Sequence, residues 1–100
     1  MFVRIWAFRP AADREGEFER AYGPTGPWAG LFSRAEGYLG TRLLRGPGPP
    51  TRYVTIDFWT SQAAWQAFLG EWGTEYDAVD LQCRALNSRE QRIGDFVVDE

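Results

Sequence analysis

The chain contains no histidine and no lysine, and these two absences exclude much of enzyme chemistry. Without an imidazole, the chain itself offers no histidine general base, no Ser-His or Cys-His nucleophile and no histidine ligand for haem or zinc. Without a lysine there is no Schiff-base amine and no phosphate-binding P-loop lysine. All eleven basic residues are arginine, which we attribute first to a GC-rich genome and only second to function.

Cysteine, long hydrophobic runs and excess positive charge are scarce or absent as well. The single cysteine, Cys83, permits no internal disulfide and suits a reducing compartment, and its apolar neighbours indicate packing rather than reactivity. No signal-peptide pattern opens the chain, and no apolar run approaches the ~20 residues that cross a membrane. A net charge of −3 does not favour nucleic acid or an acidic membrane. We therefore expect a cytoplasmic protein that binds neither.

Aromatic side chains are what the chain has in excess. Its hydrophobic content of 44% and charged content of 25% fit one globular domain, residues 1–100, but 16% of the residues are aromatic and five are Trp. Between Trp59 and Leu86, apolar residues recur three and four apart, as on one stripe of a helix: Trp65, Phe68, Leu69, Trp72, Tyr76, Val79, Cys83 and Leu86. Gly70 and Gly73 each cost a helix about 1 kcal/mol, so a bend or break is expected beside Trp72.

The whole chain reads as strand, helix, strand, strand, helix, strand. The expected strands are 2–9, 38–45, 52–59 and 92–98, and the expected helices run from an N-cap at Asp13 to Tyr22, from Trp28 to Ala35, and along the aromatic stripe. Two prolines and two glycines in residues 23–27 must interrupt the first helix. Residues 46–50 and 87–90 are expected to be loops. This order predicts an α+β, ferredoxin-like βαββαβ fold, with a four-stranded antiparallel sheet and the helices on one face.

Strand alternation places one set of aromatic residues together on a single face of this sheet. The set is Trp6, Phe8, Tyr53 and Trp59, mixed with Arg4, Thr55 and Asp57. We interpret this as the face that the helices leave open, and an aromatic open face indicates a partner. A second copy packed sheet to sheet would cover it and form a homodimer.

The junction of the third strand and the long helix resembles a known family. Asp57-Phe58-Trp59-Thr60-Ser61-Gln62-Ala63-Ala64-Trp65 is similar to the W-x-S-x-x-A-aromatic segment of the antibiotic biosynthesis monooxygenases. Phe18-Glu19-Arg20-Ala21-Tyr22, followed by Gly37-Tyr38-Leu39-Gly40-Thr41 entering a strand, fits this family too, as does the order of elements over nearly the whole chain. The resemblance implies a dimeric α/β barrel with a cavity in each subunit, between the sheet and its helices.

The same resemblance implies one of two activities: cofactor-independent oxygenation of polycyclic phenols, or haem degradation. The haem-degrading members rely on an Asn, a Trp and a His, whose positions fall here on Ile5, Phe68 and the region of Ala78. Haem degradation by that mechanism is therefore not expected. The oxygenases place Asn, Trp, Tyr and Arg around the cavity, and here only the residue types can be matched, not their positions.

Three residues are the candidates for catalysis: Trp72, Tyr76 and Asp57. An oxygenase whose substrate supplies the electrons needs a flat apolar slot with one or two hydrogen-bond donors. Trp72 offers an indole N–H and Tyr76 a hydroxyl. Asp57 would act as a base if burial raised its pKa. The competing interpretation is that Asp57 pairs with an arginine across the sheet or the dimer interface, Arg4 or Arg42 being the first to examine.

Four further residues are expected to contact the substrate: Tyr22, Trp28, Thr41 and Phe68. Tyr22 and Trp28 flank the Gly-Pro interruption, which is either a lid or a simple turn, and Thr41 would point in from the second strand. Core packing is the competing explanation for each aromatic residue. No carboxylate pair has the spacing of a metal site, so we expect neither a metal nor a cofactor.

Together with these observations, the resemblance implies a monooxygenase that oxidises a small phenol- or hydroquinone-like molecule with O2. One alternative is a non-catalytic ligand-binding or structural dimer of the same fold, favoured by the absence of any strong base. Another is an isomerase or lyase that uses Asp57. The places of Asp57 and Tyr76 separate these interpretations. An open cavity beside both residues would favour the two enzyme interpretations. Packing or salt bridges in its place would favour the non-catalytic protein.

Overall fold

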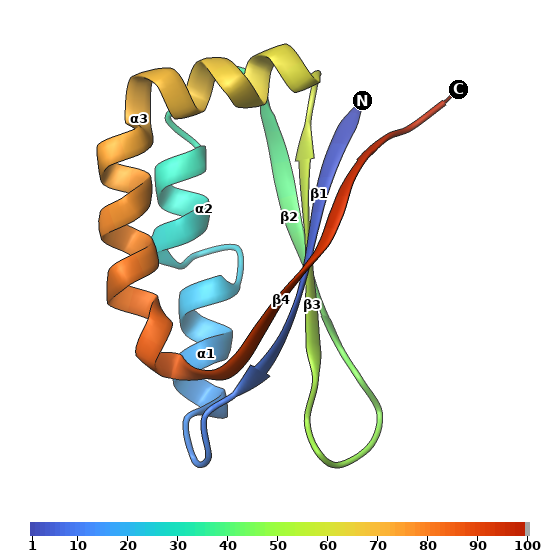
Figure 1. Ribbon diagram of the computed structural model, residues 1–100, viewed down its shortest axis with the longest axis vertical. Helices are drawn as coiled ribbons and strands as arrows, with labels where there is room; N and C mark the ends of the chain where they lie inside the picture. The colour runs from blue at the N-terminus through green and yellow to red at the C-terminus, as the bar shows by residue number, and fades with distance from the viewer. Residues whose placement is uncertain (100) are drawn as a thin grey trace.

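The computed structural model describes residues 1–99, which form a four-stranded sheet with helices along one side (Figure 1). The strands are β1 (Phe2–Pro10), β2 (Tyr38–Arg45), β3 (Tyr53–Trp59) and β4 (Asn87–Val97). The helices are α1 (Glu15–Tyr22), α2 (Pro27–Phe32) and α3 (Gln62–Cys83), followed by the 3-10 turn η1 (Arg84–Leu86). The strand order β2-β3-β1-β4, with antiparallel neighbours, confirms the predicted ferredoxin-like fold.

Local sequence explains where the helices begin and end. The Gly-Pro segment separates α1 from α2 as predicted, and Pro27 occupies the first helical position, where its missing N–H is not needed. Ser61 caps α3, because its hydroxyl accepts a hydrogen bond of 3.1 Å from the backbone N–H of Ala64. These short-range rules place α2 and α3 without reference to the rest of the chain.

Several strand ends differ from the prediction by one residue, and three further differences concern the helices and the loop before the last strand. Arg14, not Asp13, is the residue before α1, since Asp13 adopts a left-handed conformation with φ of 63°. Helix α2 ends at Phe32, ahead of the predicted Ala35. Residues 87–90 belong to β4 rather than to a loop, because they pair with the end of β1. An edge strand with solvent on its open side accepts such polar residues.

Helix α3 bends at Trp72, between the two glycines, as predicted. The φ and ψ of Trp72, −117° and 18°, are not helical. Figure 1 shows the first part of α3 running across the end of the sheet and the second part turning down beside α1 and α2. The aromatic stripe is therefore divided between two directions, and Leu69 is 36% exposed rather than buried.

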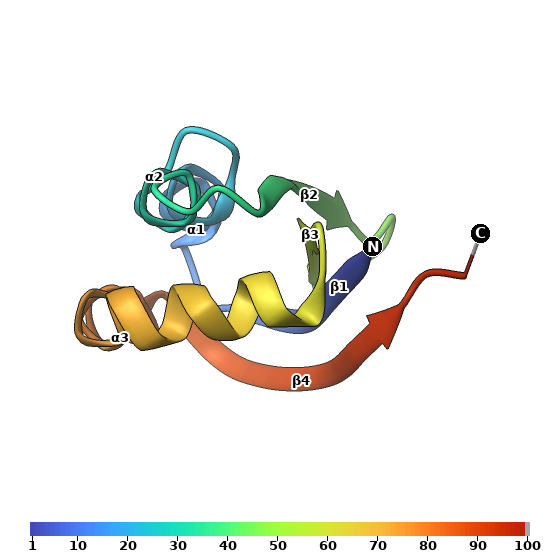
Figure 2. The same cartoon turned by 90° about the horizontal axis from the view of Figure 1, so that it is seen from above.

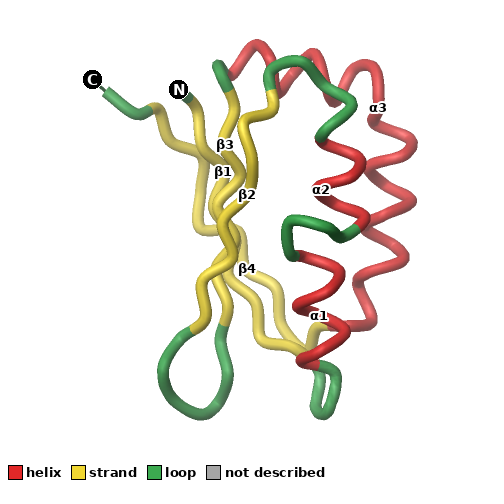
Figure 3. The backbone as a smooth tube through the Cα atoms, turned by 180° about the vertical axis from the view of Figure 1, so that it is seen from behind, coloured by secondary structure: helices red, strands yellow, loops and turns green. Residues whose placement is uncertain are grey.

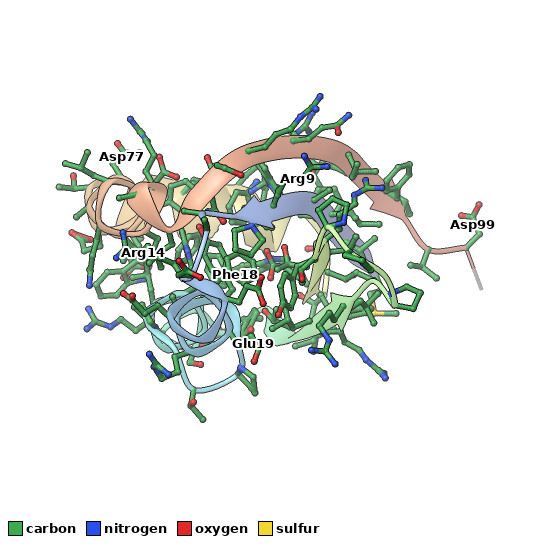
Figure 4. The ribbon with its side chains drawn as sticks, turned by 90° about the horizontal axis from the view of Figure 1, so that it is seen from below. Arg9, Arg14, Phe18, Glu19, Asp77 and Asp99 are labelled. Atoms are coloured by element: carbon green, nitrogen blue, oxygen red, sulfur yellow. The ribbon has the colours of Figure 1, made fainter. Side chains whose placement is uncertain are left out.

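The helices cover the aromatic face of the sheet. Two clusters fill the space between the layers: Phe8, Phe18, Ala21, Tyr22, Tyr53, Cys83 and Leu86 in one, and Phe2, Leu31, Phe32, Trp59, Trp65 and Phe68 in the other. Figure 4 shows the side chains crowded between the sheet and α1, with Phe18 among those of α1. The prediction that this face lies open was wrong. Alternation decides which residues share a face, but both faces of β1 are mostly apolar, so it could not decide which face the helices cover.

The opposite face of the sheet has no helix over it in the described chain (Figures 2 and 3). We call it the outer face. It carries the other alternating set: Val3, Ile5 and Ala7 of β1, Val54, Ile56 and Phe58 of β3, and Phe96, which pairs with Val3. Phe96 is 48% exposed and Leu44 of β2 is 46% exposed. A contiguous apolar face of this kind is typical of a surface that another molecule covers.

The segment before β2 packs closely against α3 at Gly37, which gives a test of this packing. A Cβ at Gly37 would lie 2.3 Å from the Cβ of Ala64, so Gly37→Ala should lower the free energy of unfolding by about 1–3 kcal/mol. Gly70→Ala in α3, where a Cβ meets nothing within 4 Å, should instead raise it by about 0.5–1 kcal/mol. Urea denaturation measures both, and an unchanged Gly37→Ala protein would contradict the close approach.

Candidate functional site

A cavity of about 260 Å³ lies between the sheet and the helices. Its lining comes from four strands and three helices: Arg4, Trp6, Phe8, Tyr22, Trp28, Phe32, Thr41, Thr55, Asp57, Tyr76, Asp80 and Glu90. The volume is slightly below the ~300–1,000 Å³ usual for small-molecule sites, and the wall is largely aromatic. The cavity therefore suits one small, flat ligand.

The cavity lies where polar side chains interrupt the core rings along the middle of the covered face, with the partly buried Trp6 as the ring of β1 among them. Along β1 the face begins with Phe2 in one aromatic cluster and ends with Phe8 in the other, and along β3 Trp59 and Tyr53 do the same. The positions between them include Arg4, Thr55 and Asp57, which line the cavity. The rings at both ends hold the layers apart, and the smaller or polar side chains in the middle leave the space unfilled.

Five of the residues predicted from the sequence meet at this cavity: Tyr22, Trp28, Thr41, Asp57 and Tyr76. Trp28 and Tyr76 pack edge to face, with ring centroids 5.1 Å apart. The enzyme interpretations required Asp57 and Tyr76 to lie beside a cavity, and both line it. The Gly-Pro interruption sets Tyr22 and Trp28 on consecutive helices at one end of this wall.

Two predicted residues, Phe68 and Trp72, lie outside the lining. Phe68 is 1% exposed and packs between Trp59 and Trp65 in the core. Trp72 lies under the guanidinium of Arg34, 5.1 Å from the ring centroid. The bend in α3 occurs at Trp72 itself, so helical spacing no longer predicts where its side chain points. The prediction that these two rings contact a ligand is not supported by their positions.

The sequence-based site omitted seven lining residues: Arg4, Trp6, Phe8, Phe32, Thr55, Asp80 and Glu90. The alternation of the strands had already indicated most of the strand residues among these seven. Arg4, Trp6 and Phe8 had been placed on the same face as Asp57, but that face was taken to be the open one. Asp80 and Glu90 had no such signal, since they come from the end of α3 and from β4.

Asp57 is the most perturbed acid of the site. The Thr41 hydroxyl donates a hydrogen bond of 2.7 Å to Oδ1 of Asp57, and the hydroxyls of Tyr38 and Thr41 are also hydrogen-bonded. Burial raises the pKa of Asp57 from 3.8 to about 6, while the Thr41 hydrogen bond and the charge of Arg4 oppose the rise. The carboxyl therefore titrates just below neutral pH, where a general base is most useful.

Arg4 faces the cavity but is bound to a different carboxylate. It lies directly opposite Asp57 in the β1–β3 register, yet its Nε donates to Oδ1 of Asp95, 3.0 Å away. Its guanidinium stacks on Trp65 at 4.0 Å from the ring centroid. Arg42, the other arginine considered for Asp57, is exposed and pairs in register with Ile56. The predicted Asp57–arginine ion pair is thus not formed among residues 1–99.

Two tyrosines of the lining remain neutral donors at ordinary pH. Burial raises the pKa of Tyr22, whose hydroxyl accepts a hydrogen bond of 2.9 Å from Nδ2 of Asn87. Burial also raises the pKa of Tyr76, with Arg4 partly offsetting it. The indole N–H of Trp28 is buried and has no acceptor within the described part of the chain. Such a group costs free energy unless a water or a ligand satisfies it.

The described residues offer no cluster of side chains suited to a metal ion. No group of three or more His, Cys, Asp or Glu in residues 1–99 could hold a metal ion. Cys83 is buried, and burial raises the pKa of its thiol, as its apolar surroundings predicted. Within the same range, no helix combines the length and the apolar character needed to cross a membrane.

Comparison with known proteins links this chain to a family. The family model for antibiotic biosynthesis monooxygenases matches residues 1–72. Among solved structures, a mutant of SnoaB, a cofactor-independent oxygenase from Streptomyces nogalater, is 25% identical, with a TM-score of 0.77 over 99% of this chain and 93% of that one. No match was found among curated proteins.

Two further structures share the fold. A mutant of MhuD, with two manganese protoporphyrin IX groups bound per active site, is 25% identical, with a TM-score of 0.70 over 98% of this chain and 94% of that one. A protein from Nitrosomonas europaea, named as a candidate antibiotic biosynthesis monooxygenase, is 15% identical, with a TM-score of 0.72 over 98% of each chain. At that identity the likeness shows the fold alone.

The raised pKa of Asp57 predicts that the carboxyl opposes folding at neutral pH. Its folded pKa of about 6 lies above the ordinary 3.8, so stability is lost as the pH rises through this range. Asp57→Asn should therefore raise the free energy of unfolding by about 1–3 kcal/mol at pH 7 and much less at pH 4. Denaturant titrations at both pH values measure the difference. Asp77→Asn, on the outer surface of α3 (Figure 4), controls for loss of one charge, and an equal gain at both pH values would contradict the shift.

Proposed function

This chain belongs to the antibiotic biosynthesis monooxygenase family, and on that premise we propose that it oxidises a small aromatic molecule, a phenol or hydroquinone, with O2 and no cofactor. The position of Asp57 carries the proposal. A carboxyl with a pKa of about 6 lies on the wall of a ring-lined cavity, where it can take the proton of a hydroxyl group on a bound aromatic ring.

The lining supports a flat aromatic ligand. Trp6 and Phe8 lie side by side on β1, with ring planes 18° apart, and Trp28 and Tyr76 face the cavity from the helices. Rings on both layers provide stacking and edge contacts for another ring. The volume of about 260 Å³ restricts the ligand to a small molecule or to part of a larger one.

The proposed chemistry uses the substrate as the source of electrons. Asp57 takes the phenolic proton, and the resulting phenolate is electron-rich enough to reduce O2. One oxygen atom then forms a bond to a ring carbon, which loses its hydrogen, and the other leaves as water, so a phenol plus O2 becomes a quinone plus water. Tyr76, kept neutral by its raised pKa, can donate a hydrogen bond to the oxygen on which negative charge develops.

The pKa of Asp57 also limits the substrate class. An ordinary phenol has a pKa near that of tyrosine, about 10, so proton transfer to a base of pKa about 6 is uphill by roughly 5 kcal/mol. A phenol whose anion is conjugated with a carbonyl group is more acidic and lowers this cost. We therefore expect carbonyl-bearing polycyclic phenols to be better substrates than simple ones.

A non-catalytic ligand-binding protein is the second candidate. The charge of Arg4 is already engaged by Asp95, and the site has few other donors for a developing anion. An isomerase or lyase, the third possibility, shares the requirement that Asp57 reach the cavity and differs in needing no O2.

We also propose that the outer face binds a second copy of the chain. The sequence placed the homodimer contact on the aromatic face, which the helices cover. The outer face is the sheet face that remains for this contact, and it carries the exposed apolar residues Leu44 and Phe96. Burying that surface against its own copy removes it from water, which is the usual driving force for such association.

Oxygen uptake tests the catalytic proposal. In the dark and with a chelator present, the protein should consume O2 with a panel of naphtho- and anthra-hydroquinones and of polycyclic phenols, fastest with the phenols that carry a carbonyl group. Asp57→Asn should lower kcat/KM by about 10²–10⁴-fold, as expected for loss of a general base. Tyr76→Phe should lower it by about 10²-fold, as expected for loss of one donor to the developing anion. Tyr53→Phe, which removes a hydroxyl bonded to Glu19 away from the cavity, is the matched control.

Two results would redirect this proposal. Loss of uptake in Trp72→Phe but not in Tyr76→Phe would move the site to the bend of α3. No uptake above the buffer rate, with ligand binding still detected by quenching of Trp fluorescence, would leave the binding protein as the function.

The dimer is tested by changing the outer face. Phe96→Glu places a charge on the exposed apolar surface and should shift the molar mass measured by light scattering from dimer to monomer at micromolar concentration. Leu81→Glu, at a position on α3 that is 69% exposed, should leave the mass unchanged. A wild-type monomer at all concentrations would rule out this use of the outer face.

A further inference from the structure

Three side chains on the covered face form a hydrogen-bonded chain that ends on Asp57. The Thr41 hydroxyl donates to Oδ1 of Asp57 over 2.7 Å, and the Tyr38 hydroxyl is hydrogen-bonded to that of Thr41. Thr41 and Asp57 are direct partners in the β2–β3 register. Tyr38 is half-buried, and its ring packs against Phe32 and Trp59.

A bulge in β2 makes this chain possible. Residues three apart in a regular strand point to opposite faces of the sheet, so Tyr38 and Thr41 would normally be separated. Here the register shifts between Tyr38 and Gly40, and Gly40 adopts a φ of 131°, which favours glycine. The irregularity brings both hydroxyls to the covered face. Bulges of this kind commonly re-aim a side chain beside a functional site.

Counting protons fixes the direction of the chain. A hydroxyl group has one hydrogen to donate. The hydrogen of Thr41 goes to the Asp57 carboxylate, so Thr41 can only accept from Tyr38. Tyr38 therefore holds Thr41 in the orientation that stabilises ionised Asp57. Protonation of Asp57 removes the reason for that orientation and allows both hydroxyls to turn.

We propose that Tyr38 is a positioning residue that acts through Thr41 to set the pH at which Asp57 becomes a base. For catalysis this rests on the proposed function, because the tuned carboxylate is the base of the oxygenase. Tyr38 itself is not among the lining residues, so it acts on Asp57 without touching the ligand.

The other charged and titratable groups around Asp57 do not replace this chain. Arg4 faces it from β1 but binds Asp95, and Tyr76 and Asp80 line the cavity from α3. Glu90 lines it from β4. Thr41 is the one side chain of residues 1–99 that hydrogen-bonds the Asp57 carboxyl. Burial raises the pKa of Asp57, and this hydrogen bond is the first influence that opposes it.

The test is the pKa of Asp57, measured by carbon-13 NMR of its carboxyl group during a pH titration of the protein without substrate. Thr41→Val should raise this pKa by about one to two units, the size expected for losing a hydrogen bond to a charged group. Thr41→Ser keeps the hydroxyl and should remain near the wild-type value. Tyr38→Phe keeps the ring and should raise the pKa by about half a unit, because Thr41 loses its fixed orientation.

The double variant separates positioning from a general effect on structure. If Tyr38 acts through Thr41, Tyr38→Phe should cause no further shift in the Thr41→Val background. Tyr53→Phe, the loss of a tyrosine hydroxyl elsewhere on β3, should not move the Asp57 pKa. A Tyr38→Phe variant with the wild-type pKa, or a shift that persists without the Thr41 hydroxyl, would overturn the inference.

Oxygen uptake keeps this inference distinct from the proposed function. Shifted pKa values without any uptake would retain the role of Tyr38 and reject the oxygenase. O2 uptake together with an unshifted Asp57 pKa in Tyr38→Phe would retain the oxygenase and reject the role of Tyr38. If the oxygenase and the role of Tyr38 are both correct, the acid limb of the pH profile of kcat/KM should move to higher pH. The size of this move should follow the Asp57 pKa measured for each variant.

Discussion

Burial of aromatic rings between one face of the sheet and the helices is the interaction on which the rest of this structure depends. Trp59 and Phe18 are fully buried, and Tyr53 and Phe68 are nearly so. The rings form one cluster at each end of the central strands, and the cavity is the space between the clusters. Because large rings set the separation of the layers, smaller and polar residues in the middle cannot close it.

The same arrangement gives Asp57 its chemistry at the expense of stability. A carboxyl among rings is poorly solvated, so its pKa rises toward neutrality. An apolar residue would suit this position better for folding alone. A destabilising acid on the wall of a ring-lined cavity is typical of a functional site, and the Thr41 hydrogen bond keeps the acid ionisable there.

Two backbone irregularities adapt a regular fold to this site. Helix α3 bends at Trp72, and beyond the bend Tyr76 lines the cavity, whereas Trp72 packs against the second aromatic cluster. The bulge in β2 sets Tyr38 and Thr41 on one face. Gly70 and Gly73 indicated the bend in the sequence. Gly40 gave no comparable signal, since an isolated glycine at the start of a strand has several explanations.

The sequence by itself determined the order of elements, the interruption at residues 23–27, the bend in α3 and the sets of residues that share a strand face. These features follow from local periodicity and from proline and glycine chemistry, which act over a few residues. It also named five residues that line the cavity, although core packing or an ion pair explained the same residues equally well until the structure placed them.

Only the tertiary structure decided which face of the sheet the helices cover, and with it the place of the site and of the outer face. Both alternating sets of β1 are largely apolar, so hydrophobicity alone could not choose between them. The choice depends on how the rings of α1, α2 and α3 pack against the rings of β1 and β3. That packing joins residues far apart in the chain, as do the contacts of Asp57 with Thr41 and of Arg4 with Asp95.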